Sequence, residues 1–274
     1  MGLLEGKKAI ITGSGRGVGK AIATLFAGQG ASVVINDLDA EPAQETADEI
    51  NKSGGKAVIC AGSVTDVEFP EKLVNTAIND LGGLDIIVNN AGYTWDAVVQ
   101  NQTDEQWYAM IDVHATAPFR IIRAAAKYIK DTAKKEQAEG IINNRKIINI
   151  TSLAGVGGNA GQINYSAGKA AMIGITKTMA KEWGRYNVNV NAVAYGAIGT
   201  RLTQATDEKE IIEVQGKKIG IGVPKSFMQG MKMLCPLGRV GTPEEAAGPV
   251  LFLASPLSNY VSSEVLIVSG GLVL

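Results

Sequence analysis

The chain has 274 residues and a mass of 28.7 kDa, and its 26 basic and 27 acidic residues leave a formal net charge of −1. This near-neutral balance argues against a nucleic-acid-binding protein, which carries a basic surface. Glycine is over-represented, with 33 residues beside only 8 prolines, but the G-X-Y period of collagen is missing. An apolar share of 46% indicates a globular protein with a sizeable core.

Metal and membrane sites are not expected. The chain contains two cysteines, Cys60 and Cys235, and one histidine, His114, too few for a His/Cys zinc site. Residues 1–10 contain no apolar run of signal-peptide length, and the longest uncharged stretches contain Asn, Ser, Gly or Pro. We therefore expect a cytoplasmic protein without a metal, a nucleic-acid partner or a membrane partner.

Short apolar runs rich in Ile and Val recur along the chain and predict parallel strands buried on both faces. They cover residues 9–12, 32–36, 57–61, 85–89, 146–150, 188–194 and 265–268. Helix-like stretches separate them, and Thr242-Pro243-Glu244-Glu245 forms a capping box at the start of one such stretch. This alternation predicts an α/β fold, a Rossmann-type doubly wound parallel sheet of about seven strands in three αβα layers. No linker divides the chain, so residues 1–274 are expected to form a single domain.

Two segments interrupt the alternation of strands and helices. Residues 127–145 form a long charged extension before the fifth strand, and residues 201–235 contain no clear strand. A loop as long as the second one is usually functional, so we expect a substrate lid at about 201–235. Its apolar residues suit a hydrophobic substrate; they are Phe227, Met228, Met231, Met233 and Leu234. Its lysines suit the phosphate of a phosphopantetheine-type thioester; they are Lys209, Lys217, Lys218, Lys225 and Lys232. The alternative is a solvated amphipathic lid that contacts no such group.

A glycine-rich loop follows the first predicted strand and precedes a helix, with the sequence Thr12-Gly13-Ser14-Gly15-Arg16-Gly17-Val18-Gly19. Glycines let backbone amides approach a pyrophosphate, and the helix directs its positive N-terminus at the same group. The spacing is G-x-x-x-G-x-G instead of G-x-G-x-x-G. We expect the loop to bind a dinucleotide, with a ligand-free turn as the alternative. The candidate residues are Gly13, Gly15, Arg16, Gly17, Val18 and Gly19.

Asp37 closes the second predicted strand, followed by Leu38, and both are expected beside the adenosine ribose. A carboxylate there accepts hydrogen bonds from the ribose and repels a 2′-phosphate, which favours NAD over NADP. Helix capping is the alternative role, for which Asp39 competes. Arg16 is a cation able to pair with a 2′-phosphate. We therefore expect NAD(H) as the preferred cofactor, with NADP(H) possible.

A Y-x-x-x-K pattern places Tyr165 and Lys169 on one face of a helix. Ser152 lies just beyond the fifth strand, where α/β sheets bind their ligands. A phenol with a pKa near 10 is a poor acid–base group at neutral pH. A nearby ammonium and the positive charge of an oxidised nicotinamide favour its phenolate. We expect Ser152 to hydrogen-bond a substrate oxygen while Tyr165 transfers the proton.

With these motifs in place, the chain resembles the short-chain dehydrogenase/reductase family over essentially its whole length and is similar to its 3-oxoacyl-[acyl-carrier-protein] reductases. The matching segments are 12–19, Asn89-Asn90-Ala91-Gly92, Ser152 with Tyr165 and Lys169, 195–200, 237–244 and Gly270-Gly271. The resemblance implies further cofactor contacts from Ser63, Val64, Asn90, Ala91, Gly92, Gly196, Ile198 and Thr200. It also implies that Tyr165 and Lys169 contact the cofactor, with Lys169 on the nicotinamide ribose. A homo-oligomer, tetramer or dimer, packed through helices 107–129 and 165–183 is implied as well.

Three positions depart from the family pattern. His114 replaces an asparagine that is thought to help hold a water of the proton relay. Histidine also donates and accepts hydrogen bonds, so a direct role and a purely structural one stay open. Ser63 replaces an acidic residue beside the adenine, and Tyr195 replaces a proline, which is expected to narrow the nicotinamide pocket or alter its loop.

The expected function is an NAD(P)-dependent oxidoreductase that interconverts a ketone and a secondary alcohol by hydride transfer, with Tyr165 as acid and base. A 3-oxoacyl or 3-hydroxyacyl thioester is the leading substrate hypothesis. A sugar, a steroid or a cyclic secondary alcohol is the alternative. A non-catalytic nucleotide-binding regulatory protein is the alternative from another class.

Overall fold

Seven parallel strands form the central sheet in a computed structural model of the chain, which describes residues 2–206, 210–214 and 216–272. The strands are β1 (Lys8–Ile11), β2 (Ser32–Ile35), β3 (Lys56–Ile59), β4 (Ile86–Asn89), β5 (Arg145–Ser152), β6 (Val188–Tyr195) and β9 (Val265–Val268). Their order across the sheet is β3-β2-β1-β4-β5-β6-β9. The order changes direction between β1 and β4, which is the switch point where α/β sheets bind ligands.

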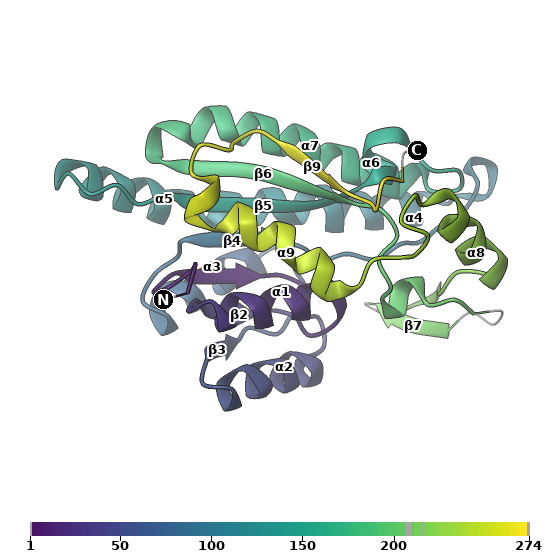
Figure 1. The fold of residues 1–274 in the computed structure, drawn as a ribbon, viewed down its shortest axis with the longest axis horizontal. Helices are drawn as coiled ribbons and strands as arrows, with labels where there is room; N and C mark the ends of the chain where they lie inside the picture. Colours follow the sequence, from purple (N-terminus) through teal and green to yellow (C-terminus); the bar gives the residue numbers. More distant parts are fainter. Residues whose placement is uncertain (1, 207–209, 215, 273–274) are drawn as a thin grey trace.

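Helices cover both faces of the sheet and confirm the predicted three layers (Figure 1). One face carries α1 (Gly17–Gly28), α2 (Ala40–Lys52) and α9 (Pro243–Ala254). The other carries α3 (Phe69–Asp80), α4 (Asp104–Ile111), α5 (Ala117–Ala138) and α7 (Ile163–Trp183). Successive side chains of a strand point to opposite faces, so Ile11 joins the first core and Ile10 the second.

The predicted capping box forms at the start of α9. The Thr242 hydroxyl accepts from the Glu245 amide at 3.2 Å, and the Glu245 carboxylate accepts from the Thr242 amide at 3.0 Å. Pro243 takes the first helical position, where its missing N–H costs nothing. The box fixes the start of α9, which packs against α1 and covers the sheet beside the glycine-rich loop.

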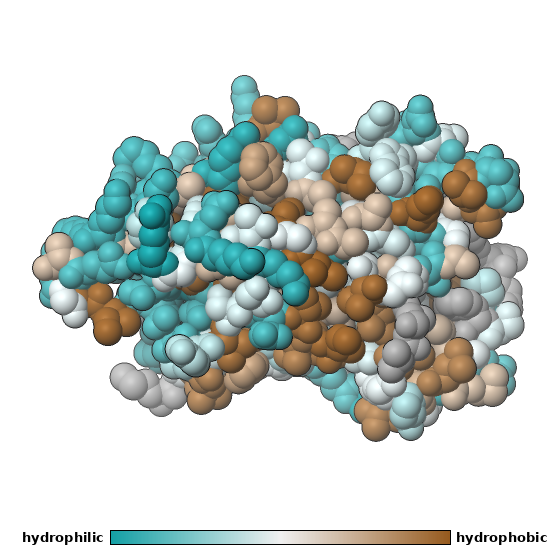
Figure 2. Space-filling model, turned by 90° about the horizontal axis from the view of Figure 1, so that it is seen from above, coloured by the Kyte–Doolittle hydropathy of each residue, from teal (hydrophilic) through white to brown (hydrophobic). Residues whose placement is uncertain are grey.

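The charged segment 127–145 is largely helical, because α5 continues to Ala138. The buried α5 residues Ile121, Ala125, Ile129 and Ala133 form one apolar stripe that continues into this charged segment. The end of α5 projects from the molecule (Figure 1), and hydrophilic side chains gather at this end (Figure 2). None of the helices in the described part of the chain combines the length and apolar composition needed to cross a bilayer.

Segment 201–235 contains strands, contrary to the expectation from the sequence. β7 (Glu210–Val214) and β8 (Lys217–Ile221) form an antiparallel hairpin, and α8 (Lys225–Leu234) follows. Each strand has five residues, and charged residues are mixed with the isoleucines. Gly216, with φ of +77°, adopts the left-handed backbone of the turn. A short exposed hairpin lacks the continuous apolar run of the central strands, so the pattern that predicts buried strands does not detect it.

Candidate active site

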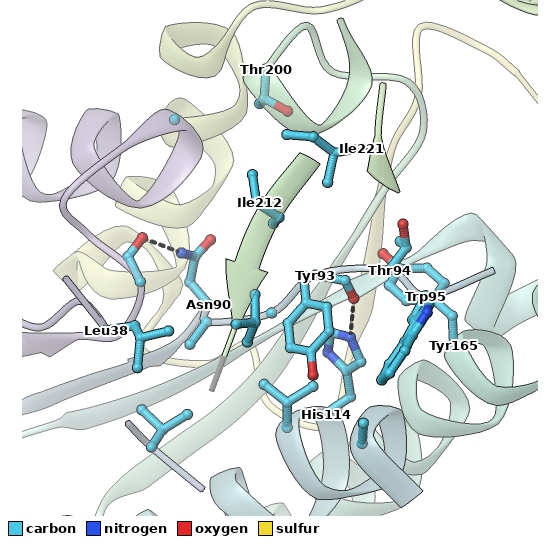
Figure 3. Close-up of a pocket in the computed structure, with 18 of the residues that line it drawn as sticks. Leu38, Asn90, Tyr93, Thr94, Trp95, His114, Tyr165, Thr200, Ile212 and Ile221 are labelled. Atoms are coloured by element: carbon cyan, nitrogen blue, oxygen red, sulfur yellow. Dashed lines mark hydrogen bonds between the residues drawn. The ribbon is translucent and has the colours of Figure 1, made fainter. Parts of the chain in front are cut away.

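A cavity of about 1320 Å³ opens at the carboxyl ends of the central strands and extends beneath the β7–β8 hairpin (Figure 3). It brings together all but one of the candidate catalytic and cofactor-binding residues identified from the sequence. Those lining it are Gly13, Arg16, Gly17, Val18, Gly19, Asp37, Leu38, Ser63, Val64, Asn90, Ala91, Gly92, Ser152, Tyr165, Lys169, Gly196, Ile198 and Thr200. Gly15 is the exception. Its amide donates to the Asp37 carboxylate at 3.0 Å, so it acts on the site through that side chain.

The glycine-rich loop forms a cradle at the switch point. Gly13 and Gly17 have φ of +63° and +55°, a backbone conformation that residues other than glycine rarely adopt. A Cβ on Gly13 would also lie 2.9 Å from the Cα of Ala91. The Thr12 hydroxyl accepts from the amides of Asn90 and Ala91, both at 2.9 Å, and so joins this loop to the one after β4. The N-terminus of α1 and the open backbone beside it fit the pyrophosphate of a dinucleotide.

Asp37 presents its carboxylate at the β2 end of the cradle. Burial raises the pKa of this carboxyl, against the opposing effect of hydrogen bonds from the amides of Asp39 and Gly15. Arg16 lies nearby but pairs with Asp39 at 2.9 Å, and both side chains of this pair are about half exposed. Asp37 therefore offers a fixed acceptor for a ribose hydroxyl, while the cation of the loop already has an anionic partner.

The catalytic candidates meet at the carboxyl end of β5. Ser152 is the last residue of that strand, and its hydroxyl caps the short helix α6 (Leu153–Gly157) by accepting from the Ala154 amide at 3.2 Å. Tyr165 and Lys169 lie one turn apart on α7. The Lys169 ammonium lies 5.6 Å from the centre of the Tyr165 ring and donates to the Ile150 carbonyl at 2.9 Å.

Desolvation at the bottom of the cavity favours the neutral forms of both groups. It lowers the pKa of Lys169 to about 7. It raises the pKa of Tyr165 to about 12, against a smaller opposing effect of the Ser152 hydroxyl. The lowered phenol pKa expected from the sequence is therefore not found in the folded protein without cofactor, because burial outweighs the hydrogen bond of Ser152.

His114 lies beside these residues, in a π-helical turn, Asp112–Thr116, between α4 and α5. Its imidazole is 1% exposed, and Nε2 lies 2.8 Å from the Tyr93 carbonyl oxygen (Figure 3). The ring meets the Tyr165 ring edge to face, with centroids 5.1 Å apart and an interplanar angle of 89°. Burial and the charge of Lys169 lower the pKa of His114 well below its usual value.

The loop after β4 supplies cavity residues that the sequence reasoning missed, namely Tyr93, Thr94 and Trp95. Asn164 was missed as well. It is fully buried and its amide donates to the carbonyls of Trp95 at 3.0 Å and Gln106 at 3.1 Å. Asn164 thereby fixes the loop against α4 and α7. Two aromatic residues directly after the Asn-Asn-Ala-Gly motif were the available signal for this wall.

The hairpin closes the cavity from the opposite side. Ile212 and Ile221 face the cavity across from Tyr93 and Trp95 (Figure 3). The Lys217 ammonium lies 2.9 Å from the Glu105 carboxylate and 5.6 Å from the centre of the Trp95 ring. These contacts join the hairpin to the far wall of the cavity.

The expectation that the apolar residues of α8 cover the substrate is wrong for the residues described. None of the described α8 side chains lines the cavity, and Met233 and Leu234 are 77% and 70% exposed. The amphipathic helix directs these residues to its outer side. Of the lysines named from the sequence, Lys217 lines the cavity, and Lys209 lies outside the described part of the structure. The side chain of Phe227, one of the apolar candidates, also lies outside the described part.

Tyr195 lies at the end of β6, and its ring packs in the core on the α9 side of the sheet. Its hydroxyl donates to the Ala246 carbonyl at 2.6 Å. The ring is 7% exposed, so most of its volume is accommodated in the core.

A dinucleotide cradle at the switch point, with a serine, a tyrosine and a lysine at the next strand end, defines a nicotinamide-dependent oxidoreductase. The family model described as short chain dehydrogenase matches residues 7–211, and the chain belongs to that family. It is an oxidoreductase that acts on CH–OH groups with a nicotinamide cofactor, as its relatives also indicate.

Among curated proteins, the chain is 37% identical to a 3-oxoacyl-[acyl-carrier-protein] reductase of Thermotoga maritima, over 99% of both chains. It is 38% identical to the reductase of that name from Aquifex aeolicus, over 98% of both. Among solved structures, a 7α-hydroxysteroid dehydrogenase complexed with NADH and 7-oxo glycochenodeoxycholic acid matches with a TM-score of 0.84 and 32% identity, covering 98% of this chain and 95% of that one. A gluconate 5-dehydrogenase from Burkholderia cenocepacia, in complex with NADP and tartrate, matches with a TM-score of 0.84 and 30% identity, over 98% and 96% of the chains.

Proposed function

We propose that this protein interconverts 3-oxoacyl and 3-hydroxyacyl thioesters. The observation that carries the proposal is the position of Ser152, Tyr165 and Lys169 in the same cavity as the dinucleotide cradle. The curated relatives that match almost the whole chain are 3-oxoacyl-[acyl-carrier-protein] reductases, which supports this substrate class.

In the proposed reduction, the Ser152 hydroxyl donates a hydrogen bond to the substrate carbonyl oxygen and polarises it. The Tyr165 phenol, which its raised pKa keeps protonated, transfers its proton to the same oxygen. Lys169 lies one turn away, where its ammonium orients the ribose and supports the charge on Tyr165. The bound nicotinamide supplies the hydride.

The cavity wall supports an acyl substrate. Trp95 from the loop after β4 and Ile212, Val214 and Ile221 from the hairpin present apolar side chains to the cavity. Contact with such a wall stabilises a hydrocarbon chain by about 0.8 kcal/mol for each buried methylene group. The similarity to dehydrogenases of a steroid and of gluconate keeps a sugar, a steroid or a cyclic secondary alcohol as the second candidate class.

The test is the initial rate of NADH consumption with three substrate classes: 3-oxoacyl thioesters of rising chain length, keto-steroids with cyclic ketones, and keto-sugar acids. We expect kcat/KM for the thioesters to exceed the other classes by at least about tenfold, with KM falling as the chain lengthens. A steroid or sugar acid as the best substrate contradicts the acyl assignment. Tight NADH binding without turnover of any class supports the regulatory alternative instead.

We also propose that NAD(H) is preferred over NADP(H). Asp37 is held by two backbone amides at the ribose end of the cradle, where its charge repels a 2′-phosphate. Arg16 is already paired with Asp39, which reduces its attraction for that phosphate. Titrations of cofactor fluorescence are expected to show tighter binding of NADH than of NADPH. Asp37→Ala is expected to weaken NADH binding by about tenfold or more, as the loss of charge-assisted hydrogen bonds implies. Tighter binding of NADPH by the unmodified protein contradicts this preference.

We propose further that residues 1–274 form one domain in which the segment at about 201–235 acts as a substrate lid, through the hairpin contacts of Lys217 with Glu105 and Trp95.

We also propose a homo-oligomer, a dimer or a tetramer. Its support is apolar exposure on one of the helices expected at the interface, where Phe119 of α5 is 49% exposed. Light scattering coupled to gel filtration is expected to give two or four times 28.7 kDa. A monomer at micromolar concentration contradicts the proposed assembly.

A further inference from the structure

The imidazole of His114, the single histidine of the chain, is buried between the Tyr93 loop and the Tyr165 ring. The π-helical turn Asp112–Thr116 places it there, between two helices that pack on the same face of the sheet. Such turns interrupt a regular helix and occur frequently at functional sites. The ring therefore contacts both the Tyr93 loop, on the wall proposed to bind the substrate, and Tyr165, the proposed proton donor.

The hydrogen bond to Tyr93 determines which ring nitrogen carries the proton. A backbone carbonyl only accepts, so Nε2 donates to the Tyr93 oxygen at 2.8 Å, and Nδ1 carries the lone pair. Nδ1 is buried and has no hydrogen-bond partner among the described residues. Protonating it would place an unpaired charge in the interior close to Lys169. The geometry therefore holds the ring as the neutral Nε2–H tautomer.

Two positions beside this ring require glycine, because a side chain there would collide with His114. A Cβ on Gly92 would lie 2.2 Å from His114 Cε1, and a Cβ on Gly168 would lie 2.9 Å from His114 Cβ. Gly92 does not adopt the left-handed backbone, so the imidazole, and not the φ angle, makes glycine necessary there. Residues from the loop after β4 and from α7 thus leave space for His114.

We infer that His114 is a positioning residue of the proposed reaction, which holds the Tyr93 carbonyl through Nε2–H and the Tyr165 ring through its own ring edge. The inference rests on the proposed function, because positioning is meaningful only where Tyr165 transfers a proton. His114 itself exchanges no proton during turnover. The hydrogen bond fixes the loop that forms the substrate wall, and the ring contact fixes the phenol that meets the reacting oxygen.

A first experiment uses ¹⁵N-histidine NMR on the full chain without a histidine tag, in which the single histidine gives one set of ring signals. The titratable groups around the ring are Tyr93 of the loop and Tyr165 and Lys169 of α7. We expect a neutral Nε2–H tautomer that does not titrate between about pH 5 and pH 8. A titrating ring or an Nδ1–H tautomer overturns the inference. This readout needs no turnover, so it separates a failure here from a failure of the proposed function.

A second experiment separates the two contacts. His114→Gln keeps a donor near the Nε2 position without the ring, and His114→Phe keeps a ring without the donor. We expect the glutamine variant to lower kcat about tenfold with little change in KM, and the phenylalanine variant to raise KM about tenfold with a smaller change in kcat. Equal kcat and KM effects in both variants, or values within twofold of the unmodified protein, overturn the inference.

A double-mutant cycle covers the case in which single His114 variants lose stability. Gly92→Ala is expected to displace the imidazole and to lower both kcat and Tm, because of the 2.2 Å approach. His114→Ala removes the obstacle, so the double variant is expected to be no worse than His114→Ala alone. Gly174→Ala on α7, whose Cβ would meet nothing within 4 Å, is the control and is expected to retain activity. Additive losses of Tm and kcat in the double variant overturn the inference.

Discussion

Among single residues, the charge of Lys169 determines how the proposed reduction depends on pH. Tyr165, with a pKa of about 12, remains protonated over the working range, whereas Lys169 has a pKa of about 7. The pH dependence of kcat/KM reports groups of the free enzyme. We expect kcat/KM for NADH in ketone reduction to be high below pH 7 and to fall as pH rises through that value, since Lys169 then loses its proton.

The matched variant for this prediction is Lys169→Arg, because a guanidinium stays charged throughout the range. It is expected to be slower, since its geometry differs, but to lose the inflection near pH 7. Rates of NADH oxidation between pH 5.5 and pH 9 measure both proteins. The same inflection in both would assign the titration to another group.

The sequence identified site residues where local spacing carries the information. Tyr165 and Lys169 are one helical turn apart, and Gly13 to Gly19 directly follow a strand, so short-range geometry suffices. Trp95 and Asn164 owe their role to contacts between segments far apart in the chain, which no local pattern contains. The pKa directions of Tyr165 and Lys169 also depend on burial, a property of the folded cavity.

At the level of elements, strand prediction succeeded for all seven strands of the central sheet, of which the five inner strands are largely buried and the edge strands β3 and β9 are partly exposed. The seven central strands are rich in apolar residues, mostly Ile and Val, and each was placed to within about two residues. The hairpin was missed because Glu210, Glu213, Lys217 and Lys218 interrupt its apolar residues without a regular period. The extent of α5 was underestimated because the charges of its exposed side conceal a stripe of small apolar residues such as Ala133.

The hairpin contributes a substrate wall, and Ile212 tests this role. Ile212 faces the cavity from β7, so Ile212→Ala removes apolar contact with the substrate. We expect KM for a medium-chain 3-oxoacyl thioester to rise about threefold to tenfold with kcat nearly unchanged. Steady-state kinetics measure the change. Ile142→Ala, at an 80% exposed position far from the cavity, is the control and is expected to leave KM unchanged. An equal rise in both variants contradicts the role of the hairpin.

For the molecule as a whole, stability is expected to depend on a buried lysine at the opposite end of the sheet. Lys146 on β5 is 2% exposed, hydrogen-bonds the Ser258 hydroxyl at 3.2 Å, and has no carboxylate partner among the described residues. Burial, together with the nearby charge of Lys7, lowers its pKa to about 8 from 10.5. The unfolded chain therefore binds this proton more tightly than the folded protein does, and stability rises with pH between about 8 and 10.5.

Lys146→Met removes this charge and keeps a side chain of similar length. The free energy of unfolding at pH 7 is expected to increase by about 1 to 3 kcal/mol, and the rise of stability between pH 8 and pH 10 to become smaller. Urea unfolding curves at several pH values measure both effects. A less stable variant with an unchanged pH slope would show that Lys146 is well compensated in the folded protein.

The fold brings the cofactor cradle, the Ser-Tyr-Lys set and the apolar wall to one end of the sheet, where we propose that Tyr165 transfers a proton. Turnover of a 3-oxoacyl thioester and NADH binding, measured side by side for the unmodified protein and Tyr165→Phe, test this claim most directly. We expect kcat to fall by about 10²- to 10⁴-fold while the Kd for NADH changes less than about twofold. Unchanged turnover by Tyr165→Phe would contradict it.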